Sequence, residues 1–217
     1  MENWIENHIT EISPKQYIPS LLHIIWIGRS PQPESLAGYV SKWKELMPHW
    51  TVRLWTNADL TEYEIHPEVL SRINEAHQGT QKADILKYYV VDKYGGVYVD
   101  ADVEPIKNLD PILYLSDLVI CHDNYVEWQY VSVGFFAASP NHPVLSKAVE
   151  LCMVASINIG APHMNTGPHV MGIAVSVVPP IDKKYTLLPM GAFYAYRNPP
   201  DTYMRFGNHL YAQSWDT

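Results

Sequence analysis

The segment 82–103 reads KADILKYYVVDKYGGVYVDADV. Apolar residues recur at helical spacing through its first part, which predicts a helix over residues 80–94 that ends at Gly95-Gly96. The alternating residues after the glycines predict a strand over 97–101, with Tyr98, Asp100 and Asp102 on one face. We therefore expect two carboxylates at the carboxyl end of a buried strand.

The rest of the chain alternates between strand and helix patterns. Apolar or alternating runs predict strands over 21–27, 51–55, 117–121 and 131–138. Helical spacing predicts helices over 35–47, 142–156 and 166–177. This alternation indicates an α/β layered fold, whose ligands bind beyond the carboxyl ends of the strands. No repeat or linker divides the sequence, so we expect one domain over residues 1–217, either complete or cut from a longer protein.

Composition limits the possible functions. The chain has 217 residues, of which 47% are hydrophobic and 18% charged, as in a globular protein. Its formal net charge of −8 opposes binding to a nucleic-acid phosphate backbone. The N-terminus lacks the pattern of a signal peptide, and no apolar run reaches the roughly 18 residues of a membrane span. We expect a soluble, cytoplasmic protein that binds no nucleic acid and has no membrane span.

The aspartate pair at 100 and 102 has a specific chemical meaning. Two close carboxylates raise each other's pKa unless a cation lies between them. Mn²⁺ or Mg²⁺ prefers such oxygen ligands and also binds the oxygens of a diphosphate. As a Lewis acid, the ion stabilises the charge that develops when a sugar–phosphate bond breaks. The alternative is a solvated pair of aspartates without function, because a DxD sequence by itself is common.

The two blocks Lys82–Tyr89 and Tyr94–Val103 resemble the sugar-binding DXD region of GT-A glycosyltransferases. The likeness is to mannosyl-, galactosyl- and glucosyltransferases of the polysaccharide type and, more distantly, to the clostridial glucosylating toxins. It extends from about residue 18 to residue 215 and includes three further segments: Ile18–Gly28, Thr166-Gly167-Pro168, and His209 to Ser214-Trp215. The resemblance implies a single Rossmann-like GT-A domain with a mixed, mostly parallel central sheet.

The resemblance also implies where the donor binds. Trp26 would stack on the nucleotide base, and the backbone of Ile25 and Ile27 would read its edge. Asp84 and Lys87, which share a helix face, would bind hydroxyl groups of the donor sugar. A further set would surround the ribose and the diphosphate: Tyr98 and Asp100 near the ribose, and Ser214 and Trp215 as a lid.

A metal and a catalytic set follow from the same resemblance. Asp102 would bind Mn²⁺ (or Mg²⁺) directly, Asp100 would lie beside it, and His209 would be a third ligand. The predicted catalytic residues are Asp84, Lys87, Asp100 and Asp102. The chain departs from the family pattern at two positions, with Lys87 in place of the usual Arg and Gly134 in place of a frequent Asn.

The predicted reaction transfers a hexose or deoxyhexose from a nucleotide sugar to a glycan hydroxyl with retention of configuration. A UDP-sugar is the first candidate donor and GDP-mannose the second. One rival is a phosphatase of the haloacid-dehalogenase type, which would carry its aspartate motif on the first strand. The other rival is a non-catalytic module that binds nucleotide sugars or glycans.

Overall fold

The computed structural model describes residues 15–122, 131–179, 185–194 and 205–211. Its strands are β1 (Leu21–Ile25), β2 (Thr51–Trp55), β3 (Gly96–Val99), β4 (Val103–Pro105), β5 (Leu118–His122), β6 (Val131–Ala138), β7 (Thr186–Leu188) and β8 (Gly207–His209). Its helices are α2 (Glu34–Leu46), α3 (Pro67–Glu75), α4 (Gly79–Tyr94), α5 (Pro143–Val154), α6 (Pro162–Asn165) and α7 (Pro168–Val177). Short 3₁₀ turns cover Asn57–Asp59, Asp110–Tyr114 and Met190–Ala192.

A six-stranded mixed sheet forms the centre of the molecule, in the order β2-β1-β3-β6-β5-β7. β1 is parallel to β2 and β3, and β5 is parallel to β7, whereas β6 runs antiparallel to both of its neighbours. A second sheet contains only β4 and β8. The predicted α/β fold with a mostly parallel mixed sheet is confirmed.

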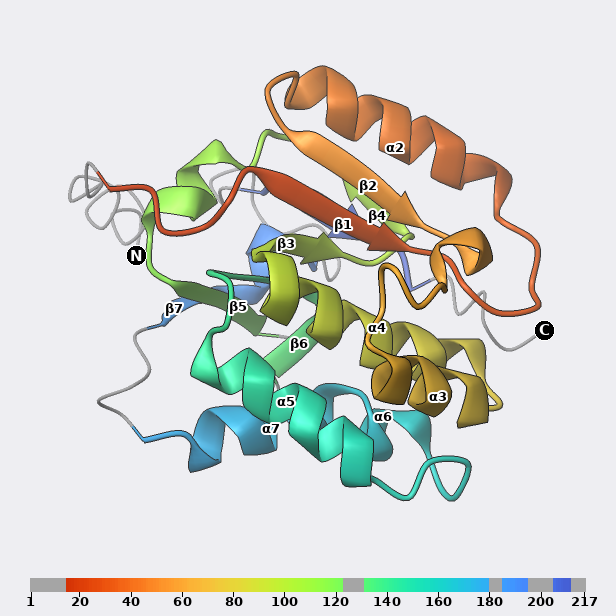
Figure 1. Cartoon of the computed structure of the whole chain (residues 1–217). Helices are drawn as coiled ribbons and strands as arrows, with labels where there is room; N and C mark the ends of the chain where they lie inside the picture. The colour runs from red at the N-terminus through yellow and green to blue at the C-terminus, as the bar shows by residue number, and fades with distance from the viewer. Residues whose placement is uncertain (1–14, 123–130, 180–184, 195–204, 212–217) are drawn as a thin grey trace.

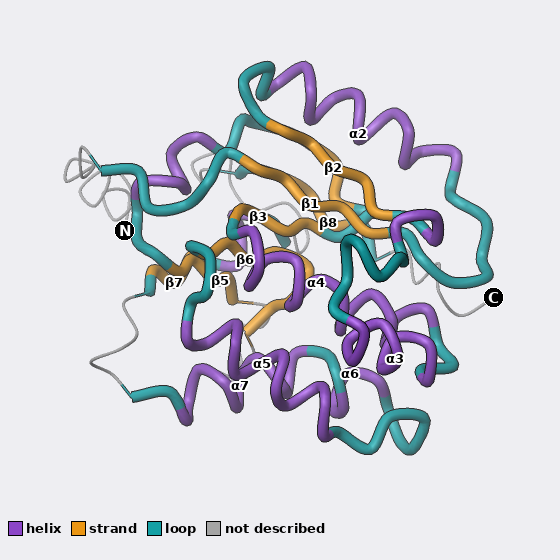
Figure 2. Tube along the Cα trace, viewed as in Figure 1, coloured by secondary structure: helices purple, strands orange, loops and turns teal. Residues whose placement is uncertain are grey.

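Helices cover both faces of the sheet, with α2 on one side and α3 to α7 on the other (Figures 1 and 2). Successive strand residues point to opposite faces. Tyr98 and Phe136 therefore pack in the core beneath α4 and α5, while Val97, Val99 and Phe135 pack in the core that includes α2. This arrangement buries β3 completely. Because β1, β2 and β3 are parallel, the carboxyl end of β3 lies on the same side of the sheet as those of β1 and β2.

The Gly95-Gly96 turn connects α4 to β3 with positive φ angles of 66° and 103°. A Cβ atom on Gly96 would lie 2.4 Å from the carbonyl oxygen of Leu21, so only glycine permits this approach of β3 to β1. The buried imidazole of His23 on β1 links this turn to Trp55 on β2. Its Nε2 donates to the Gly95 carbonyl at 2.9 Å, and its Nδ1 accepts from the indole N–H of Trp55 at 3.0 Å.

His23 makes the stability of the fold depend on pH. Burial, with a smaller contribution from the charge of Arg53, lowers its pKa from 6.5 to about 4 against the opposing effect of the Gly95 carbonyl. Between these values the unfolded chain binds more protons than the folded chain, so the stability falls as the pH drops from 6.5 towards 4. We expect His23 to account for roughly 2 kcal/mol of stability lost between pH 7 and pH 5.

Urea unfolding of wild type and His23→Gln at pH 7 and pH 5 measures this contribution. The glutamine amide can still donate towards Gly95 but does not titrate in this range, so the variant should lose less stability on acidification. An equal loss in both proteins would show that His23 is not responsible.

Several elements differ from those predicted. β3 ends at Val99, two residues earlier than predicted, and Asp100 and Asp102 lie in a turn instead of on one strand face. Helix α7 begins at Pro168 and not at Thr166. Five helices and strands were not predicted at all: α3, α6, β4, β7 and β8. No helix among the described residues is long and apolar enough to cross a membrane.

Candidate active site

Three elements bring their polar side chains together at the carboxyl end of β3. Asp84 and Lys87 come from α4, the two aspartates follow β3, and His209 ends β8. The pairing of β4 with β8 sets Val103 opposite His209, and the Leu210 amide donates to the Asp102 carbonyl at 3.2 Å. The small sheet therefore holds a histidine next to the aspartate turn.

Asp100, Asp102 and His209 form a cluster suited to a divalent ion. Nε2 of His209 lies 3.1 Å from Oδ2 of Asp100 and 3.5 Å from Oδ1 of Asp102, and the three donor atoms lie within 4.8 Å of one another. Nδ1 of His209 accepts from the Tyr211 amide at 3.1 Å, so Nε2 is the nitrogen that faces the aspartates. Two carboxylates and an imidazole are a donor set that fits Mn²⁺, and less closely Mg²⁺.

Asp100 is held in its charged form. Its burial by itself would raise its pKa, but the charge of Lys87, the contact with His209 and a hydrogen bond from Tyr98 together lower the pKa below the usual value. The Tyr98 hydroxyl donates to Oδ1 of Asp100 at 2.6 Å. Asp100 is therefore ready to interact with a cation through its other oxygen.

Asp84 and Lys87 form a buried ion pair on α4, next to Asp100. The Lys87 Nζ lies 2.5 Å from Oδ1 of Asp84, and the two side chains are 4% and 12% exposed. Burial raises the pKa of Asp84, although Lys87 and a hydrogen bond from Thr166 oppose the rise. The ammonium also lies 5.2 Å from the centre of the Tyr98 ring. One lysine thus compensates the charge of both Asp84 and Asp100.

Gly134, one of the two departures from the family pattern, lies against the aspartate turn. The Asp100 amide donates to the Gly134 carbonyl at 2.8 Å. A Cβ atom at this position would lie 2.8 Å from Oδ2 of Asp100, 2.8 Å from the Tyr194 hydroxyl and 2.9 Å from the His209 ring. A larger residue here would require these side chains to move, so the glycine allows Asp100, Tyr194 and His209 to pack closely.

The residues predicted to bind the nucleotide lie near one another but are largely covered. Ile25 is fully buried, while Trp26 is 5% exposed and donates its indole N–H to the Ser30 carbonyl at 3.0 Å. Tyr98 is 1% exposed, with its hydroxyl bound to Asp100. Base stacking by Trp26 and a ribose contact by Tyr98 remain predictions. Ser214 and Trp215, the predicted lid, lie outside the described residues.

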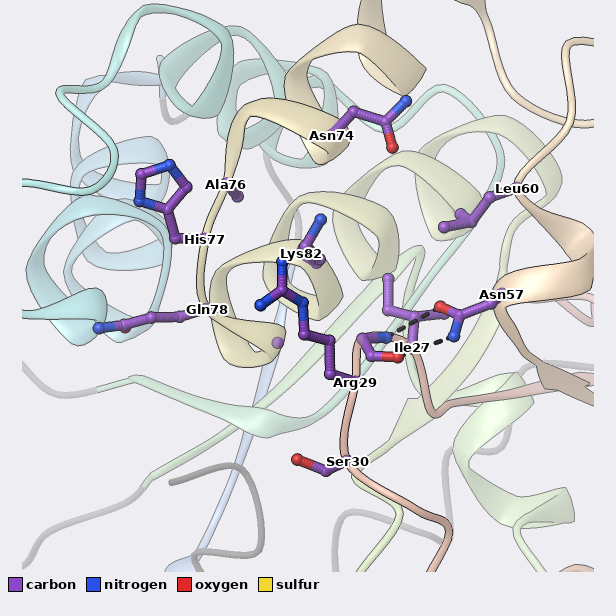
Figure 3. Close-up of a pocket in the computed structure, with 12 residues that line it drawn as sticks. Ile27, Arg29, Ser30, Asn57, Leu60, Asn74, Ala76, His77, Gln78 and Lys82 are labelled. Carbon is purple, nitrogen blue, oxygen red and sulfur yellow. Dashed lines mark hydrogen bonds between the residues drawn. The ribbon is translucent and has the colours of Figure 1, made fainter. Parts of the chain in front are cut away.

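A pocket of about 680 Å³ opens at the carboxyl ends of β1 and β2, beside the start of α4 (Figure 3). Ile27 is one of its walls, and Arg29 and Lys82 bring two positive charges into it. Burial and then the charge of Arg29 lower the pKa of Lys82. Asn57 fixes the wall by two reciprocal hydrogen bonds with the Gly28 backbone, at 2.9 and 2.8 Å.

Three residues of this pocket were not predicted from the sequence: Arg29, Asn57 and Lys82. Asn57 could have been found, because it lies two residues beyond a predicted strand and therefore at the ligand-binding edge of the sheet. Arg29 and Lys82 carry no such signal, since they become neighbours only when the loop after β1 meets α4.

Part of the chain matches a known family of glycosyltransferases. Residues 33–118 match the family described as "Glycosyltransferase sugar-binding region containing DXD motif". The chain is 25% identical over 175 residues to inositol phosphoceramide mannosyltransferase 3 of Schizosaccharomyces pombe, covering 78% of this chain and 48% of that protein. It is 26% identical over 162 residues to the mannosyl phosphorylinositol ceramide synthase CSH1 of Saccharomyces cerevisiae, covering 72% and 42%. The chain thus spans less than half the length of these two relatives.

Among solved structures, the PaToxG glycosyltransferase shares the fold. The two chains align with a TM-score of 0.59 at 17% sequence identity, over 80% of this chain and 74% of the other. The matched family segment runs from the start of α2 through the aspartate turn and the 3₁₀ turn at Asp110–Tyr114 to the first residue of β5. Together, the matched DXD segment, the relatives and the shared fold support a glycosyltransferase of the GT-A type.

Proposed function

We propose that the protein transfers a hexose from a nucleotide sugar to a glycan hydroxyl with retention of configuration, in a reaction that depends on Mn²⁺ or Mg²⁺. The observation that supports this most directly is the cluster of Asp100, Asp102 and His209 at the end of β3, whose two aspartates lie within the family match. In the reaction, the bond between the anomeric carbon and the diphosphate oxygen breaks. The acceptor oxygen bonds to that carbon, and its proton leaves with the diphosphate or to solvent.

The divalent ion would be held by Asp100, Asp102 and His209, where it supplies Lewis-acid stabilisation of the leaving diphosphate. Asp84 would accept hydrogen bonds from hydroxyl groups of the donor sugar. Lys87 pairs with Asp84, lowers the pKa of Asp100 and would add positive charge near the scissile bond.

The pocket lined by Ile27, Arg29 and Lys82 is our proposed site for the nucleotide. Its position at the carboxyl ends of β1 and β2 is where ligands bind in α/β sheets. In a chain with a net charge of −8, the two cations offset part of the phosphate charge locally.

The names of the relatives favour one donor sugar over the others. Two of the similar proteins bear names that specify mannosyl transfer to inositol phosphoceramide. We therefore propose mannose as the transferred sugar, which favours GDP-mannose over a UDP-sugar as donor. An inositol-containing glycolipid or another glycan is the proposed acceptor.

Release of nucleoside diphosphate tests the proposal. We expect the protein with Mn²⁺ to release GDP from GDP-mannose, faster when inositol phosphoceramide is present and at background level when EDTA is added. UDP-glucose and UDP-galactose serve as comparison donors, and faster release of UDP would change the donor but not the reaction.

Two results would contradict the proposed function. Phosphate release from a phosphomonoester would support the phosphatase interpretation. Binding of nucleotide sugars with no turnover under any of these conditions would support a non-catalytic module.

A further inference from the structure

The turn Thr166-Gly167-Pro168 joins α6 to α7 and packs against the buried side of α4. Thr166 is completely buried, and its hydroxyl donates to Oδ2 of Asp84 at 2.9 Å. The same hydroxyl could also donate to the Pro162 carbonyl, but that oxygen lies farther away, at 3.3 Å. Since a hydrogen bond to a carboxylate is the stronger of the two, the threonine proton belongs to Asp84.

The other two residues of the turn fix its distance from α4. The Tyr88 hydroxyl donates to the Gly167 carbonyl at 3.1 Å, one helical turn from the contact at Asp84. A Cβ atom at Gly167 would lie 2.8 Å from the Cα of His163, so only glycine fits without displacement. Pro168 begins α7, where its missing N–H leaves no helical hydrogen bond unmade. Each residue of the turn thus has a definite physical role.

The carboxylate of Asp84 is fixed from both sides by these contacts. Lys87 binds Oδ1 at 2.5 Å and Thr166 binds Oδ2 at 2.9 Å, so the plane of the carboxylate cannot rotate without losing a partner. Each oxygen retains lone-pair capacity for another donor. A sugar hydroxyl is a directional hydrogen-bond donor, and its recognition needs a carboxylate whose orientation is already set.

We propose that Thr166 is a positioning residue for donor-sugar recognition, which acts by orienting Asp84 through the hydrogen bond between Oγ1 and Oδ2. This inference rests on the proposed function, because it assigns Asp84 to the sugar. It does not involve the nucleotide pocket, so Thr166 should affect the sugar-dependent part of donor affinity and leave the affinity for the nucleoside diphosphate unchanged.

The experiment compares the dissociation constants of GDP and GDP-mannose with Mn²⁺, measured by calorimetry for wild type, Thr166→Val and Thr166→Ser. Valine keeps the shape of threonine without its hydroxyl, whereas serine keeps the hydroxyl. We expect Thr166→Val to weaken GDP-mannose binding roughly tenfold or more with unchanged GDP binding, and Thr166→Ser to recover most of the loss. If Thr166→Val does not fold, Thr166→Ala, which leaves room for a water molecule, replaces it.

A double-mutant cycle with Asp84→Asn tests whether Thr166 acts through Asp84. We expect Thr166→Val to weaken GDP-mannose binding much less in the Asp84→Asn background than in wild type. Ser146→Ala is the matched control, since it also removes a hydroxyl that donates to a carboxylate, that of Asp92 at 2.7 Å, but outside the site.

The outcomes separate the inference from the proposed function. If wild type binds none of the four ligands GDP, GDP-mannose, UDP and UDP-glucose, the proposed function is wrong and the inference with it. If wild type binds the sugar nucleotide more tightly than the diphosphate and Thr166→Val retains that difference, only the role of Thr166 is wrong. Equal weakening of both ligands by Thr166→Val would indicate a purely structural threonine and would also overturn the inference.

Discussion

Replacement of Asp102 by alanine should abolish Mn²⁺-dependent turnover, with a loss of roughly 10³-fold or more in kcat/KM. The variant would leave Asp100 and His209 as an incomplete set of protein ligands. The leaving diphosphate would then develop its charge without the ion that offsets it. Because Asp102 lies in a turn and its side chain is 16% exposed, we expect little change in the thermal unfolding temperature.

Glu104→Ala is the matched control for Asp102→Ala. Glu104 is a carboxylate two residues further along the chain, but it is exposed on β4. Its loss should leave both turnover and Mn²⁺ affinity close to wild type. Near-normal activity of Asp102→Ala would disprove the site assignment, and an equal loss in both variants would indicate a general effect of charge.

Replacement of Lys87 by methionine should cost about 3–5 kcal/mol of unfolding free energy at neutral pH. The variant keeps two carboxylates, on Asp84 and Asp100, whose charge is disfavoured by burial, and it removes the cation that opposes this effect at both. The midpoint of urea unfolding measures the loss. A double variant, Lys87→Met with Asp84→Leu, should recover part of the stability, because it removes both charges of the buried pair. It should recover no turnover, because it lacks the Asp84 carboxylate that we propose binds the donor sugar.

Lys42→Met provides a control with the same spacing. Lys42 pairs with Glu45 three residues later on α2, with side chains 47% and 70% exposed. An exposed pair contributes little, so this variant should cost less than about 1 kcal/mol. Similar losses from Lys87→Met and Lys42→Met would show that burial of the Lys87 pair has little energetic effect.

The periodic parts of the sequence predicted the fold well. β1, β2, β6 and α4 follow from runs of apolar residues whose spacing matches strands or helices. α3 was missed although Val69 and Ile73, both buried, lie four residues apart behind a proline at the helix start. This spacing, together with the proline, is typical of a helix, so the sequence does contain a signal for α3.

The small sheet could not be predicted in the same way. β4 and β8 have three residues each and are strands only because they pair with each other. A three-residue segment carries no usable period, and its partner is about a hundred residues away. The turn at Asp100 was missed for a related reason, since the alternating pattern continues past Val99 while the backbone leaves the sheet to meet β8.

For the candidate site, the family resemblance brought Asp84, Lys87, Asp100, Asp102 and His209 into one prediction, and the structure places them together. The surrounding contacts needed coordinates. No pattern shows that Ser132 and Tyr194 are hydrogen-bonded beside Gly134, or that Thr166 reaches across to α4. Such contacts join residues far apart in sequence, so they have no local period.

The pairing of β4 with β8 has a consequence for the order of assembly. Asp100 and His209 are 109 residues apart, so a chain in which β8 has not yet joined β4 has the two aspartates but lacks the imidazole beside them. Closing so long a loop carries an entropic cost that must be met before the contact forms. A bound ion would favour the completed arrangement by mass action. The affinity for the ion would then be higher in the fully folded chain than in a chain whose β8 is unpaired.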